Sequence, residues 1–130
     1  MKQVLLVDDD PTQLAVRQLL LGREGIQSLL ATEARTALAL LNSDAGRETI
    51  GLVVTDHLMP EVNGAEFVRE IRSFDPNLPI VVISGLPDAH NAYDGLDVLF
   101  LAKPCEPEDL IAIVRNALTR TPGGSAYLAS

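Results

Sequence analysis

The chain has 130 residues and a formal net charge of −8. The length fits one domain with its own core, and 47% hydrophobic with 22% charged residues excludes a disordered chain. The acidic balance argues against a nucleic-acid surface, which needs clustered Lys and Arg. No apolar run approaches the ~20 residues of a membrane span, and the single cysteine, Cys105, favours a reducing compartment such as the cytoplasm.

Strand-like and helix-like segments alternate along the chain. Continuous apolar runs are typical of strands that are buried on both faces, and the segments between them repeat apolar residues at helical spacing. The predicted strands are 4–7, 25–30, 50–55, 80–83 and 98–102. The predicted helices outside the segment between Ser84 and Lys103 are 11–21, 32–42, 65–74 and 107–119, and 43–49 is predicted to be a polar connection.

This alternation predicts an α/β fold in which helices cover both faces of a five-stranded parallel sheet. At the start of the first helix, Asp10, Pro11 and Gln13 are predicted to be the N-cap, the first helical residue and the N3 partner of a capping box. The fourth helix is expected to be shortened or irregular. The segment between Ser84 and Lys103 is short, and Pro87, Asn91 and Gly95 disfavour a helix.

Polar residues stand where the predicted strands end. Asp8 and Asp9 follow the first strand, Asp56 the third, Ser84 the fourth and Lys103 the fifth. In open parallel sheets these ends share one edge, where ligands bind. Carboxylates ~4 Å apart repel by roughly 4 kcal/mol at an effective dielectric of 20, so a hard divalent cation such as Mg²⁺ is expected among them. Each signal alone has an ordinary structural explanation, but the combination is specific.

These residues resemble the motifs of a receiver domain of a two-component response regulator. The resemblance covers about residues 2–119. It rests on Asp8-Asp9, Asp56, Met59-Pro60, Gly64, Ser84-Gly85 and Lys103-Pro104. It implies a flavodoxin-like doubly wound sheet with strand order 2-1-3-4-5. It also implies a domain that is itself phosphorylated and dephosphorylated, rather than an enzyme that turns over an external substrate.

The resemblance assigns roles to individual residues. Asp56 would accept a phosphoryl group from a phosphohistidine on a histidine kinase or a histidine phosphotransfer protein. Mg²⁺ (or Mn²⁺) would be held by Asp9, Asp56 and the backbone carbonyl of Leu58, and by Asp8 through water. Ser84 and Lys103 would bind the phosphoryl group. Phe100 matches the switch aromatic of the family, although a plain core residue is an equal explanation for it.

Two other functions remain open from the residues alone. Asp8, Asp10 and Thr12 fit the Asp-x-Asp-x-Thr motif of haloacid-dehalogenase-type phosphatases, in which Asp8 would be the nucleophile. That interpretation leaves Asp56 and Gly64 unexplained, and it lacks an acidic pair on a strand after the lysine. The other is a degenerate receiver that acts only as a binding module.

The remaining expectations concern single residues and the ends of the chain. His57 is interpreted as an exposed loop residue, with a role in tuning hydrolysis as the alternative. His90 is expected at the surface, and Cys105 is interpreted as a packing residue. Residues 120–130 are expected to be a flexible tail. No output domain follows, so we expect a stand-alone receiver, or one excised from a hybrid histidine kinase, that acts through a downstream protein or a homodimer.

Overall fold

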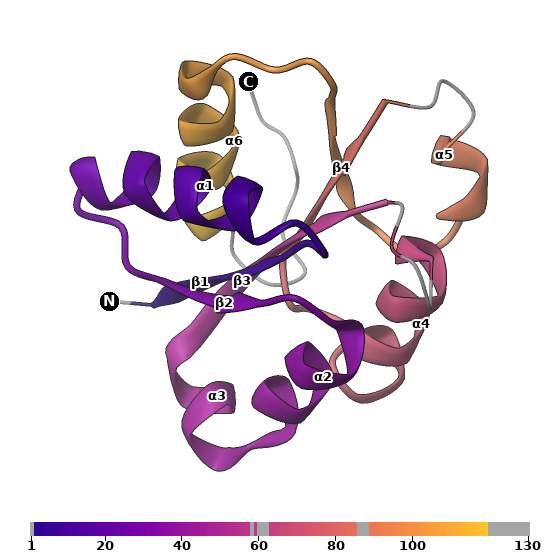
Figure 1. The fold of residues 1–130 in the computed structure, drawn as a ribbon. Helices are drawn as coiled ribbons and strands as arrows, with labels where there is room; N and C mark the ends of the chain where they lie inside the picture. The colour runs from indigo at the N-terminus through magenta and orange to yellow at the C-terminus, as the bar shows by residue number, and fades with distance from the viewer. Residues whose placement is uncertain (1, 58, 60–62, 86–88, 120–130) are drawn as a thin grey trace.

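The computed structural model describes residues 2–57, 59, 63–85 and 89–119 (Figure 1). The strands are β1 (Gln3–Val7), β2 (Ser28–Ala31), β3 (Ile50–Asp56), β4 (Ile80–Ser84) and β5 (Leu99–Ala102). The helices are α1 (Pro11–Arg23), α2 (Ala34–Asn42), α3 (Asp44–Thr49), α4 (Gly64–Phe74), α5 (Ala89–Ala92) and α6 (Pro107–Thr119). Among these residues, no helix has the length and apolar character needed to cross a membrane. The expected tail, 120–130, lies outside the described residues.

All five strands are parallel, and their order is β2-β1-β3-β4-β5. The predicted fold class is therefore confirmed. The chain first adds a strand on one side of β1 and then moves to the other side. The order reverses between β1 and β3, and this is where open α/β sheets bind their ligands.

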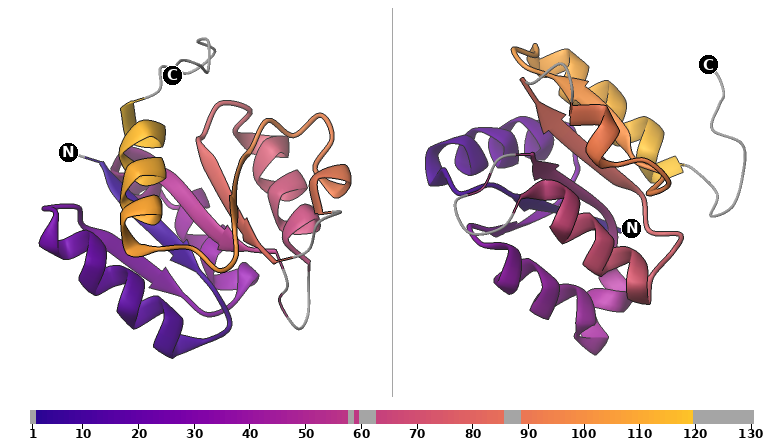
Figure 2. Two further views of the ribbon diagram at one scale, coloured as in Figure 1. Left: turned by 90° about the horizontal axis from the view of Figure 1, so that it is seen from above. Right: turned by 90° about the vertical axis from the view of Figure 1, so that its right-hand side faces the viewer.

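The helices form a layer on each face of the sheet (Figure 2). Alternate residues of each strand point to opposite faces, so side chains of the sheet pack into two separate hydrophobic cores. In β1, Val4 and Leu6 pack with α1 and α6, while Leu5 and Val7 pack with α2 and α4. The central strands are buried on both sides, which explains why they appear as unbroken apolar runs.

The start of α1 differs in one contact from the predicted capping box. Asp10 is the N-cap, and its Oδ1 accepts the Thr12 N–H at 2.9 Å, with Pro11 as the first helical residue. The backbone N–H of Asp10 donates to Asp8 Oδ1 at 3.0 Å instead of to Gln13. The predicted role of Gln13 is wrong because the nearer Asp8 carboxylate satisfies that donor.

The predicted polar connection 43–49 is also wrong, since Asp44–Thr49 forms α3. Ser43 supplies the N-cap, and its Oγ accepts the Gly46 N–H at 3.0 Å. Gly46 lies against the end of α2, where a Cβ would collide with the Leu40 carbonyl. The glycine that weakens the helix signal in the sequence is therefore what lets α3 pack there.

The shortened fourth helix is confirmed, because α5 spans only the four residues Ala89–Ala92. Pro87 and the side chain of His90 lie outside the described residues. Two arginines of α4 bind backbone carbonyls in α5, in the segment after it and in the connection between α4 and β4. Arg72 donates to the carbonyls of Leu78, Leu96, Asp75 and Asp97 at 2.8–3.1 Å. Arg69 donates to the Ala92 carbonyl at 3.2 Å. These bonds satisfy carbonyls of the connection before β4 and of the segment between α5 and β5, which have no partner within a helix there.

Candidate functional site

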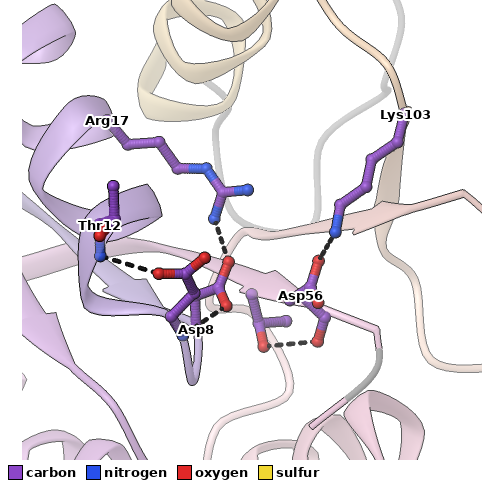
Figure 3. Close-up of polar contacts among 7 residues, drawn as sticks. Asp8, Thr12, Arg17, Asp56 and Lys103 are labelled. Carbon is purple, nitrogen blue, oxygen red and sulfur yellow. Dashed lines mark hydrogen bonds and ion pairs between the residues drawn. The ribbon is translucent and has the colours of Figure 1, made fainter.

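The predicted site residues converge at the carboxyl edge of the sheet. Asp8 follows β1, Asp56 ends β3 and Ser84 ends β4. Parallel pairing aligns these ends, with Asp56 opposite Ile83 and Ser84 opposite Ala102, and Lys103 follows directly. Figure 3 shows the side chains of Asp8 and Asp56 side by side, with Lys103 reaching Asp56 from the far strand.

Three carboxylates form an acidic cluster. Asp8, Asp9 and Asp56 each offer an oxygen, and these oxygens lie within 4.8 Å of one another. Asp8 and Asp56 are buried, whereas Asp9 is exposed. Partial desolvation raises the pKa of Asp9 above its usual 3.8, and its hydrogen bond with Asp8 and the charges of Asp8 and Asp56 act in the same direction. The cluster therefore favours a bound cation or proton.

Asp56 carries its charge in a nearly closed environment. The residue is 6% exposed, and its Oδ1 lies 2.6 Å from Lys103 Nζ. That contact is an ion pair, and no hydrogen bond from the described residues reaches this buried oxygen. The backbone N–H of Lys103 donates to the Ser84 carbonyl at 3.0 Å, and its peptide bond to Pro104 is cis. The hydrogen bond to Ser84 holds Lys103 at its backbone, while its ammonium remains partly exposed.

The donor set fits a small hard cation. Carboxylate oxygens are what Mg²⁺ prefers, and it is usually held by one or two carboxylates together with water. Asp56 contributes a buried oxygen whose partner among the described residues is the partly exposed ammonium of Lys103. Asp8, Asp9 and Asp56 are thus the residues that would hold the ion. Leu58, whose carbonyl was expected to be a further ligand, lies outside the described residues, as does Pro60.

Arg17 is a member of the site that the sequence analysis missed. Its Nη1 lies 2.9 Å from Asp8 Oδ2, and the two side chains are 9% and 4% exposed (Figure 3). A signal for it did exist. Arg17 falls at helical spacing between Leu14 and Leu21, so it lies on the buried face of α1. A charge at such a position requires a buried partner.

His57 is not the exposed loop residue that the sequence suggested. It is half-buried, and its Nδ1 lies 2.8 Å from the hydroxyl of Tyr93, which is 3% exposed. The Tyr93 ring meets Phe100 edge-on, with 5.3 Å between the ring centroids. Gly64 makes this arrangement possible, because a Cβ there would collide with the Tyr93 hydroxyl. A chain of contacts thus joins the residue after Asp56 to Phe100.

The other predicted residues take ordinary positions. Ser84 is 9% exposed and lies beside the Lys103 backbone, and Phe100 is half-buried. Asp10, which the phosphatase interpretation places in the reaction, instead caps α1. Cys105 is half-buried and lines a cavity of about 490 Å³ between α1 and the start of α6, with Arg17 and Lys103 on the same walls.

Comparisons with known proteins agree with this geometry. The family model described as "Response regulator receiver domain" matches residues 4–115. The transcriptional regulatory protein GlrR of Escherichia coli K12 is 32% identical over 91% of this chain and 26% of its own length. The response regulator SaeR of Staphylococcus aureus USA300 is 28% identical over 92% of this chain and 52% of its own length. The chain therefore spans between about a quarter and a half of these curated relatives.

A solved structure shares the fold over nearly its full length. The response regulator receiver domain protein from Clostridium thermocellum superposes with a TM-score of 0.81 and 27% identity, covering 91% of this chain and 94% of that one. The sheet order, the acidic edge and the family match all point the same way. The chain belongs to the response regulator receiver domain family.

Proposed function

We propose that this domain is a phosphoryl-accepting switch in a two-component phosphorelay, with Asp56 as the acceptor. The observation that carries the proposal is the environment of Asp56. It is a buried carboxylate at the end of β3, paired with Lys103 and set among two other carboxylates. The donor would be a phosphohistidine on a histidine kinase or a histidine phosphotransfer protein.

In the transfer step, a carboxylate oxygen of Asp56 attacks phosphorus. The phosphorus–nitrogen bond of the donor breaks, and its electron pair moves to the imidazole nitrogen, which takes up a proton. Lys103 neutralises part of the phosphoryl charge and is already in reach of Asp56. Mg²⁺ (or Mn²⁺) would be held by Asp9, Asp56 and the Leu58 carbonyl, with Asp8 acting through water, and it would supply further positive charge.

Phosphorylation adds roughly −1.5 to −2 of charge at Asp56, and nearby donors respond to it. Ser84 and Lys103 would turn toward the new oxygens, which their positions at the ends of β4 and β5 support. Phe100, which lies on β5 two strands away from β3, would report the change through its rotamer. The altered face would then bind a downstream protein or a second copy of the domain, in the cytoplasm.

Acyl-phosphate formation tests the proposal. The protein is incubated with acetyl phosphate and Mg²⁺, and the intact mass is measured. We expect a gain of one phosphoryl group that EDTA prevents and that Asp56→Asn abolishes. A mass gain that survives Asp56→Asn but is lost in Asp8→Asn would instead support the haloacid-dehalogenase-type phosphatase. A domain that gains no phosphoryl group under any condition would be a degenerate receiver.

The switch has a separate test. Beryllofluoride mimics a phosphoryl group, and with Mg²⁺ it should shift the backbone amide resonances of Ser84 and Phe100. We expect no such shift in Asp56→Asn. An unchanged spectrum of the wild-type protein at saturating beryllofluoride would refute the conformational switch.

A further inference from the structure

The ion pair between Arg17 and Asp8 is unusual because both groups are buried. Arg17 lies on the buried face of α1, and its side chain is 9% exposed. Arginine is rarely buried to this extent unless a fixed anion compensates for its lost hydration. Here the anion is an acidic residue of the cluster that would hold Mg²⁺.

Both oxygens of Asp8 already have a partner in the metal-free domain. Its Oδ2 is paired with Arg17, and its Oδ1 accepts the backbone N–H of Asp10. The Lys103 ammonium is likewise paired with Asp56 Oδ1. Among the described residues, the three carboxylates of the cluster therefore already face two cations. Lys103 is partly exposed and can swing away, but Arg17 is packed beneath the surface.

We propose that Arg17 is an internal counter-ion that stabilises the metal-free domain and lowers its affinity for Mg²⁺. The inference rests on the proposed Mg²⁺-dependent function. Arg17 offsets the repulsion among the carboxylates when no metal is bound. A dication at the cluster then meets the positive guanidinium a few ångströms away in a partly desolvated site, where screening is weak. Arg17 is thus a positioning residue that sets the metal affinity rather than a ligand.

The opposite sign would follow from a purely structural role. If Arg17 merely held Asp8 in the orientation that the metal needs, removing it would weaken Mg²⁺ binding. The charge argument instead requires that removal tighten binding. The sign of the change in Mg²⁺ dissociation constant therefore separates the two roles.

The test compares Arg17→Met with a matched control. Arg17→Met keeps the aliphatic bulk and removes the charge, and Arg23→Met removes the same charge from an exposed position in the last turn of α1. Mg²⁺ binding is measured by calorimetry, and the melting temperature is measured in EDTA. We expect Arg17→Met to bind Mg²⁺ at least about tenfold more tightly than wild type and to melt lower in EDTA. Arg23→Met should match wild type in both.

Arg17→Lys and a wild-type measurement cover the case in which Arg17→Met does not fold. Arg17→Lys keeps the charge and should retain an affinity within about threefold of wild type. In the wild-type protein, Mg²⁺ should shift the side-chain nitrogen resonance of Arg17 with the same dissociation constant as the calorimetry.

The outcomes separate this inference from the function on which it rests. Unchanged or weaker Mg²⁺ binding by Arg17→Met would overturn the inference alone, as would an unshifted Arg17 resonance. A wild-type protein that binds no Mg²⁺ would overturn both the inference and the proposed metal-dependent function.

Discussion

Replacing Tyr93 with phenylalanine removes one hydroxyl and leaves the ring that meets Phe100. The hydroxyl lies 2.8 Å from His57 Nδ1, in a residue that is 3% exposed. A neutral hydrogen bond contributes about 0.5–1.5 kcal/mol net, and a buried partner left unpaired costs about 1–3 kcal/mol. Because His57 is only half-buried, water can reach part of its ring, and we expect the free energy of unfolding to fall by about 1–2 kcal/mol.

Urea unfolding followed by circular dichroism measures this loss. The corresponding fall in melting temperature is about 4–8 °C for a domain of this size. A double-mutant cycle with His57→Phe isolates the bond, and the coupling energy should be about 1 kcal/mol. The assignment of this hydrogen bond as a stabilising contact would be refuted by either of two results. One is a free energy of unfolding for Tyr93→Phe within about 0.3 kcal/mol of wild type, and the other is additive effects of the two substitutions in the cycle.

Three further predictions follow from the same region. Burial, with the Asp56 charge, raises the pKa of Tyr93 well above 10.0, so the folded state keeps a proton that the unfolded chain releases. The free energy of unfolding should therefore decline as pH rises above 10.0, and this decline should be smaller in Tyr93→Phe. The same decline in both proteins would contradict the shift. Gly64→Ala should destabilise by about 1–3 kcal/mol, despite the better helix propensity of alanine, because its Cβ displaces the Tyr93 hydroxyl. Equal or higher stability in urea would contradict it. Arg72→Lys should lower the free energy of unfolding by about 2 kcal/mol, since an ammonium cannot reach four carbonyls. The control Arg69→Lys loses one long hydrogen bond and should lower it by less than about 1 kcal/mol. Equal losses would argue against the Arg72 contacts.

Several local features could not be predicted because the relevant signals conflict. In 43–49, Ser43 is a good N-cap, but Gly46 argues against a helix, and only packing against α2 decides in favour of α3. At Asp10 the capping residue was predictable. The choice between Asp8 and Gln13 as acceptor of its N–H depended on how β1 meets α1 in space.

The sequence by itself determined the fold class and the identity of the acidic site. Unbroken apolar runs indicate buried parallel strands, and such strands bring their carboxyl ends to one edge, so Asp8, Asp56 and Lys103 had to converge. Only the tertiary structure decided which partners surround them. The pairs Arg17–Asp8 and His57–Tyr93 join different elements through side-chain packing. Local propensity and periodicity report which face of an element is buried, but they carry no information about which side chain lies opposite.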